Sequence, residues 1–246
     1  MTLLPTTKTN PKSNLEEYTI LIYGPPKIGK STLASQFDSP LFLATEAGLN
    51  ALSVYQTPII AWEEFLNACK EIATGKHDFK TIVIDTIDNL HKYCREYVRR
   101  KNGFTHESDL DFGKGWDLTK DEFIRALTKL SLLPYGLVMI SHAEVVEIKT
   151  RTAKINKSVP TMQKNARAVV LGMADMILFC DTVVTEKEGE KRIIRTKPLE
   201  NWEAGDRTGK LPAVLPLNYN SFYNAFYGIN SEEKSVSENI KQEVLA

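Results

Sequence analysis

The chain of 246 residues has little cysteine, no excess of charge of either sign and no long apolar run. Its three cysteines, Cys69, Cys94 and Cys180, are too widely spaced for a disulfide scaffold or a zinc ribbon. Acidic and basic residues number 31 each, which excludes a generally basic, nucleic-acid-coating surface. No apolar run approaches the ~18 residues of a membrane span, and the start of the chain does not resemble a secretory signal. We therefore expect a cytoplasmic protein without membrane contact.

The remaining pattern is that of a globular α/β domain. Short apolar runs predict strands at 18–23, 41–44, 81–85, 137–140 and 176–179. Apolar residues at three- and four-residue steps predict helices at 62–72, 87–98, 123–130 and 165–171. Because apolar strands alternate with amphipathic helices, we expect a mostly parallel sheet with helices on both faces. A turn at 188–190 followed by Ile193 and Ile194 suggests a hairpin after the last of these strands. The polar segment 1–17 is expected to be a flexible arm and 231–246 an acidic tail, which leaves 18–230 as the domain.

Residues 24–31, GPPKIGKS, fit the phosphate-loop pattern GxxxxGK[ST]. They follow a predicted strand and precede a predicted helix at 32–37, which is the context that the motif requires. Gly24 and Gly29 permit a backbone whose N–H groups converge on phosphate, Lys30 reaches the terminal phosphates, and the Ser31 hydroxyl binds Mg²⁺. The nucleotide-binding residues predicted here are Gly24, Pro25, Pro26, Lys27, Ile28, Gly29, Lys30, Ser31 and Thr32.

Asp85 ends the apolar strand 81–85, at the edge where parallel sheets bind ligands. A carboxylate there can hold Mg²⁺ through water, so Ser31 and Asp85 are the predicted metal residues. The same position is also consistent with a helix cap.

These ordered motifs resemble those of the RecA-like recombination ATPases over residues 18–210. The loop GPPKIGKST is similar to the family pattern GPxxxGKTT, and LFLATEAGL at 41–49 is similar to a family strand that ends in Asp-Ala-Glu. The resemblance implies a RecA-like P-loop NTPase core that uses ATP and Mg²⁺. It also implies that Glu46 activates the attacking water, although an acid in this place is also consistent with a solvated loop residue.

Further catalytic roles follow from the same resemblance. His142 stands where the family has a glutamine that senses the γ-phosphate. The alternative is a structural histidine whose ring nitrogens are hydrogen-bonded to the backbone. The segment 193–197 is similar to one that reaches into the ATP site of a neighbouring subunit. Arg195 and Lys197 would then be trans cations in a homo-oligomer with ATP at its subunit interfaces. The basic loop 205–210 is a second candidate for this role, and all of these cations are also consistent with ordinary surface charge.

A cluster of basic residues follows His142. In the family a mobile DNA-binding loop occupies this place, so the resemblance implies that the cluster binds single-stranded DNA through phosphate contacts. The stretch 149–167 contains no acid and no aromatic residue for base stacking, and a solvated basic loop remains an alternative. The predicted DNA-binding residues are Lys149, Arg151, Lys154, Lys157, Lys164 and Arg167.

The segment 112–116, FGKGW, is similar to a motif of small phage-encoded RecA-like proteins that act in single-strand annealing. This resemblance implies a Mg²⁺-dependent ATPase that acts on single-stranded DNA in phage recombination or annealing, in the host cytoplasm. A single-strand-binding protein is a candidate partner. Two alternatives stay open: an ATP-dependent DNA- or partner-binding clamp with negligible turnover, and a small-molecule kinase whose lid is the basic stretch 95–101.

Overall fold

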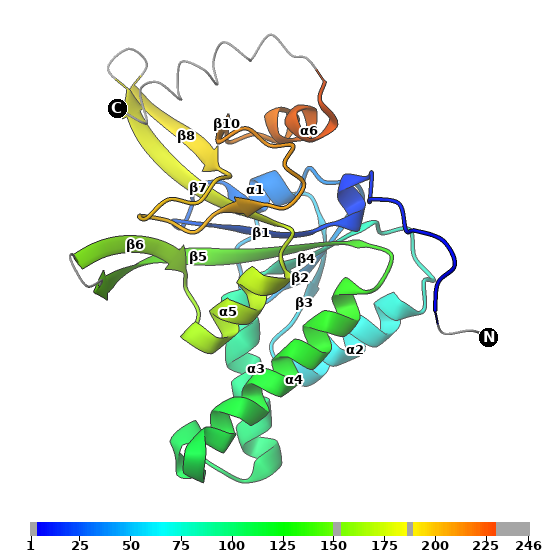
Figure 1. The fold of residues 1–246 in the computed structure, drawn as a ribbon. Helices are drawn as coiled ribbons and strands as arrows, with labels where there is room; N and C mark the ends of the chain where they lie inside the picture. Colours follow the sequence, from blue (N-terminus) through cyan, green and yellow to red (C-terminus); the bar gives the residue numbers. More distant parts are fainter. Residues whose placement is uncertain (1–3, 150–153, 186–188, 230–246) are drawn as a thin grey trace.

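The computed structural model describes residues 4–149, 154–185 and 189–229, and its centre is a twisted ten-stranded sheet (Figure 1). Six neighbouring strands run parallel, in the spatial order β7 (Met176–Thr185), β1 (Thr19–Gly24), β5 (Gly136–Lys149), β4 (Thr81–Asp85), β2 (Pro40–Ala44) and β3 (Tyr55–Pro58). Four further strands join the sheet by antiparallel pairing: β8 (Gly189–Arg195) with β7, β10 (Val214–Pro216) with β8, β9 (Gly205–Asp206) with β7, and β6 (Lys154–Pro160) with β5.

Helices cover both faces of the sheet, which confirms the predicted α/β class (Figure 1). One face carries α2 (Trp62–Ala73), α3 (Ile87–Asn102), α4 (Lys114–Ser131) and α5 (Lys164–Met173). The other carries α1 (Lys30–Ala34), α6 (Tyr219–Tyr227) and the 3₁₀ turn η1 (Leu15–Glu17). Two short turns, η2 (Glu107–Asp109) and η3 (Asp111–Gly113), connect α3 to α4. Among the described residues, none of the helices has the length and apolarity needed to cross a membrane.

The core consists of two layers because each strand sends alternate side chains to opposite faces. In β1, Leu21 packs against the α2–α5 layer, whereas Ile20 and Ile22 pack against α1 and α6. All six residues of β1 and all five of β4 are buried. Burial on both faces explains why these strands are continuous apolar runs in the sequence.

Two antiparallel ribbons extend past the end of β1 at the carboxyl edge of the sheet. Gly24, the last residue of β1, pairs with His142, so the rest of β5 projects beyond the sheet and pairs with β6. We call this pair the β5–β6 ribbon. On the other side of β1, the second half of β7 pairs with β8 to form the β7–β8 ribbon, which agrees with the predicted hairpin. The loop expected after His142 is therefore corrected to a ribbon, and Val145, Val146 and Ile148 supply the β-branched residues that favour strands.

Several element boundaries differ from those that the sequence predicts. Helix α1 ends at Ala34 rather than at residue 37, and the next residues form tighter turn bonds. Helix α4 already begins at Lys114, within the 112–116 motif. The expected arm joins the domain at Leu15, which is buried and whose N–H donates to the Tyr227 hydroxyl at 3.0 Å.

Candidate nucleotide site at the carboxyl edge

The phosphate loop connects β1 to α1, and its two glycines are required for different reasons. Gly29 has φ +115°, in the left-handed region that side chains disfavour. Gly24 is held by packing, since a Cβ on it would lie 2.4 Å from the carbonyl oxygen of Cys180 on β7. The loop therefore lies between helix α1, which follows it, and the neighbouring strand β7.

Lys30 is buried within this loop, with only 5% of its surface exposed. Its Nζ donates to the carbonyl oxygens of Gly24 at 2.9 Å and Pro25 at 2.8 Å, and burial lowers the pKa of the ammonium group. Its hydrogen-bond partners are neutral carbonyls, so its positive charge is available to an anion bound in the loop.

The two predicted metal residues lie in contact. The Ser31 hydroxyl donates to Oδ2 of Asp85 at 2.7 Å. Burial raises the pKa of Asp85, and the hydrogen bond from Ser31 opposes that rise. A hydroxyl beside a carboxylate is an oxygen donor set of the kind that Mg²⁺ prefers. The described residues contain no group of three or more His, Cys, Asp or Glu side chains that could hold a metal by themselves. This arrangement suits an ion that keeps water and phosphate oxygens as its other ligands.

Glu46 and His142, which come from opposite halves of the chain, face each other beside the loop. Glu46 Oε1 lies 3.5 Å from His142 Nε2, and the Asn89 amide donates to Glu46 Oε2 at 3.2 Å. Both carboxylate oxygens of Glu46 are therefore oriented. The sequence did not predict a role for Asn89, although its position in the first turn after the Asp85 strand could have suggested one.

Asp88 fixes the end of β5 at which His142 stands. Its carboxylate accepts from the Ser141 hydroxyl at 2.6 Å and from the backbone N–H of His142 at 2.8 Å. Burial raises the pKa of Asp88 to about 6. His142 Nδ1 is buried and, among the described residues, has no hydrogen-bond partner. The backbone alternative for this ring is therefore not what the structure shows.

Arg195 and Lys197 have acidic partners within their own chain. Arg195 Nε donates to Asp181 Oδ2 at 2.8 Å, and its guanidinium lies over the Trp202 ring at 4.1 Å. Its side chain is only 9% exposed, so within this chain Arg195 is held by Asp181 and Trp202, and the trans role stays a prediction. Lys197 is more exposed and lies 3.4 Å from Asp206.

The second candidate for a trans cation, the loop 205–210, lies away from the phosphate loop. Arg207 donates to Asp175 and to the carbonyl of Gly172. Asp175 itself accepts from the N–H of Thr19, at the start of β1. Arg207 therefore lies at the amino edge of the sheet, opposite the end that carries the phosphate loop.

Basic residues of the stretch 149–167 form ion pairs with acidic residues that lie outside that stretch. Lys154 pairs with Glu147 at 3.2 Å, and Lys157 pairs with Glu203 at 2.8 Å. Arg167 of α5 pairs with Glu144 at 3.0 Å. In the described part of the chain Lys149 and Lys164 form no ion pair, and Arg151 lies outside the described residues. Three of the six predicted DNA-binding residues therefore have acidic partners, Glu147, Glu203 and Glu144, and the role of the cluster in DNA binding stays a prediction.

The basic stretch 95–101 lies in the second half of α3, where its arginines contact neighbouring residues. Arg95 binds Glu107 through two hydrogen bonds, and Arg100 pairs with Glu63. Arg99 donates to the carbonyl of Thr105 at 3.3 Å. This stretch is a helix surface rather than a lid.

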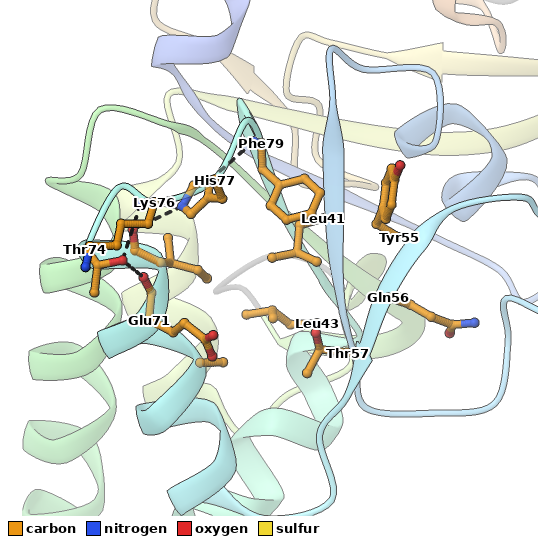
Figure 2. A pocket seen from close by; sticks show the side chains of 12 residues that line it. Leu41, Leu43, Tyr55, Gln56, Thr57, Glu71, Thr74, Lys76, His77 and Phe79 are labelled. Atoms are coloured by element: carbon orange, nitrogen blue, oxygen red, sulfur yellow. Dashed lines mark hydrogen bonds between the residues drawn. The ribbon is translucent and has the colours of Figure 1, made fainter.

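A separate pocket of about 520 Å³ opens at the far end of the sheet, between α2, β2 and the exposed edge strand β3 (Figure 2). Leu41, Leu43 and Phe79 point into it, and His77 is satisfied by the backbone of Ile72 and Phe79. Strands β5 and β4 separate β2 from β1, so this pocket is not part of the phosphate-loop site.

The fold and this loop together define a P-loop nucleotide-binding protein with a RecA-like α/β core. The chain belongs to the AAA domain family AAA_24, whose model matches residues 16–208. It is 25% identical over 238 residues to the SPbeta prophage-derived uncharacterized protein YorG of Bacillus subtilis (strain 168), across 94% of this chain and 69% of that protein. The crystal structure of the KaiC-like protein PH0186 from Pyrococcus horikoshii OT3 aligns with a TM-score of 0.43 at 13% identity, over 73% of this chain and 78% of that one.

Proposed function

We propose that this protein is a Mg²⁺-dependent ATPase. The observation that carries the proposal is the convergence, at one edge of the sheet, of Lys30, the Ser31–Asp85 contact and the Glu46–His142 pair. These side chains come from the ends of three neighbouring parallel strands and from the segments that follow them: His142 is on β5, Asp85 ends β4, Glu46 follows β2, and Lys30 and Ser31 begin α1 after β1. Phosphoryl transfer to water needs a cation on the phosphates, a metal position and a group that orients the water, and these groups supply all three.

Binding would begin in the phosphate loop. Lys30 would exchange the carbonyls of Gly24 and Pro25 for phosphate oxygens, and the loop N–H groups would bind the same phosphates. Ser31 and Asp85 would hold Mg²⁺, which when bound neutralises charge on the phosphate oxygens.

Glu46 would orient the attacking water and accept its proton. The water oxygen forms a bond to the γ-phosphorus while the bond from that phosphorus to the β–γ bridging oxygen breaks, which yields ADP and phosphate. Asn89 holds the second oxygen of Glu46 and so fixes the direction of the carboxylate. His142, which Asp88 fixes through the backbone, would donate a hydrogen bond to the γ-phosphate.

Single-stranded DNA is the partner that we propose for this ATPase, in phage recombination or annealing and with ATP at the interfaces of a homo-oligomer. The support lies in connectivity: His142 is the point at which β5 leaves the sheet and becomes the β5–β6 ribbon. A shift of His142 on hydrolysis would move a ribbon that carries Lys149. The prophage origin of the 25% identical relative also favours a phage role.

The test is steady-state ATP hydrolysis with Mg²⁺, first alone and then with single-stranded DNA. We expect measurable turnover that DNA stimulates. Bound ATP with flat, negligible turnover under both conditions would contradict the proposal and favour a clamp. No observation favours the kinase alternative, because the stretch 95–101 is not a lid.

A further inference from the structure

We propose that Arg192 binds the polyphosphate of the nucleotide held by its own chain. This inference rests on the proposed function and adds a residue that the sequence motifs do not indicate. Arg192 lies on β8, and its Nη1 donates to the carbonyl oxygen of Ile28 in the phosphate loop at 3.3 Å. Ile28 directly precedes Gly29, Lys30 and Ser31, so the guanidinium lies at the rim of the predicted phosphate cradle.

The alternation of β8 directs Arg192 to this side of the sheet. Ile194, two residues on, packs into the layer of α1 and α6, whereas Ile193 packs into a separate cluster with Val214. Since residues two apart share a face, Arg192 and Ile194 face the phosphate loop while Ile193 and Arg195 face away.

The backbone around Arg192 is fixed against the loop. The carbonyl of Arg192 accepts from the N–H of Leu217 at 3.0 Å. The side chain of Leu217 in turn lies beside Gly29, 3.8 Å from where a Cβ on that glycine would stand. Strand β8 and the segment after β10 therefore lie against one side of the phosphate loop, and Arg192 makes one of the contacts on that side.

The charge of Arg192 is not neutralised within the described residues, where it has no carboxylate partner. In contrast, Arg195 and Lys197, the cations predicted from the resemblance, each have a carboxylate partner. A guanidinium carries five N–H donors, and the contact with Ile28 uses one of them. Those that remain can bind phosphate oxygens in the bidentate geometry that arginine favours.

Arg192 would therefore act in cis, on the loop of its own chain. Its effect on nucleotide affinity should be independent of protein concentration, whereas the effect of a trans cation would require assembly.

The experiment compares five proteins by calorimetric titration with Mg·ATP at two protein concentrations: wild type, Arg192→Ala, Arg192→Gln, Lys30→Ala and Arg99→Ala. Arg99 is the control, because it is a partly exposed arginine that also donates to one backbone carbonyl at 3.3 Å. We expect Arg192→Ala to weaken Mg·ATP binding by about 10- to 100-fold, as for the loss of a charge-assisted contact, and Arg99→Ala to leave it unchanged. The loss should be the same at both concentrations.

Arg192→Gln separates charge from loop support, since glutamine keeps an N–H donor for Ile28 but has no charge. We expect it to bind Mg·ATP nearly as weakly as Arg192→Ala. Wild-type affinity in Arg192→Gln would overturn the inference, because the role of Arg192 would then be to hold the loop. If Arg192→Ala bound normally while Lys30→Ala did not, Arg192 would be a bystander and the ATPase proposal would stand. A wild-type protein that bound no nucleotide would overturn both proposals.

Discussion

The two ribbons that flank the phosphate loop both carry clustered cations, yet they use them differently. In the β5–β6 ribbon, Lys154 and Lys157 lie against Glu147 and Glu203. In the β7–β8 ribbon, Arg195 is enclosed by Asp181 and Trp202, whereas Arg192 contacts the phosphate loop itself. A basic run in the sequence therefore does not define a basic surface, because the fold brings acids from other segments against it.

Lys30 lies in the phosphate loop between the two ribbons and is a buried cation whose partners are carbonyls rather than a carboxylate. We expect Lys30→Ala to reduce ATP turnover by about 10²- to 10³-fold, since it removes a charge aimed at the phosphates. Steady-state phosphate release measures this loss. Lys120→Ala, which removes an exposed lysine of α4, is the control and should turn over ATP like the wild type. Equal rates in the two variants would contradict the site.

His91 is a buried imidazole of α3 that burial keeps neutral, in contrast to Arg195, whose charge is paired with Asp181. Burial and the neighbouring Arg95 lower the pKa of His91 to about 4. Between pH 6.5 and 4 the unfolded imidazole takes up a proton that the folded one refuses, so this residue makes stability fall as the pH falls. The loss reaches about 3 kcal/mol below pH 4.

His91→Leu should remove that loss, and urea unfolding at pH 7 and pH 4 measures it for both proteins. The raised pKa of Asp88, about 6, acts in the opposite direction, since the folded carboxyl holds its proton more tightly than the unfolded one. The difference between wild type and His91→Leu cancels the Asp88 contribution. A difference that does not change with pH would contradict the assignment.

Arg195 tests whether its cation stabilises the β7–β8 ribbon. We expect Arg195→Ala to lower the free energy of unfolding by about 2–3 kcal/mol, because it leaves Asp181 without its partner and uncovers Trp202. Lys154→Ala removes an exposed ion pair of the other ribbon and should cost less than about 0.5 kcal/mol. Urea unfolding of both variants measures the two losses. Equal losses of unfolding free energy would show that the buried contacts of Arg195 do not stabilise the β7–β8 ribbon more than an exposed ion pair does.

The smallest expected effect concerns DNA affinity at two positions that pair across the β5–β6 ribbon, Lys149 and Lys154. If the ribbon binds single-stranded DNA, Lys149→Ala should lower the slope of log affinity against log salt by about 0.7, the value for one lost phosphate contact. Lys154→Ala should change it less, since Glu147 already neutralises that lysine. Fluorescence anisotropy with a labelled oligonucleotide measures both slopes, and a larger change for Lys154→Ala would reverse the assignment.

The sequence predicted the placement of residues at the sheet edge better than the placement of those on the ribbons. Gly29, Lys30, Ser31 and Asp85 lie in segments whose apolar strands fix their place, because the ends of parallel strands meet at one edge. The same rule brought Glu46 close to His142. The partners of the cations could not be predicted, since they depend on a ribbon register and on segments distant in sequence. The direction of the Arg192 side chain could have been predicted, because Arg192 is two residues from the apolar Ile194 and shares its face of the strand.

Other elements escaped prediction because they lack the expected pattern. Strand β3, with all four residues exposed, has no apolar alternation. Helix α6 is rich in tyrosine and phenylalanine, and its place against the sheet depends on buried Phe222 and Phe226 rather than on helix propensity.

Glu46→Gln distinguishes a sheet edge that hydrolyses ATP from one that only binds it. Calorimetric titration with Mg·ATP and steady-state phosphate release are measured on the same preparations of variant and wild type. We expect Glu46→Gln to bind Mg·ATP with wild-type affinity and to hydrolyse it about 100-fold or more slowly. A variant that hydrolyses ATP as fast as the wild type, or a wild type that binds ATP without hydrolysing it, would contradict the proposal that this edge hydrolyses ATP.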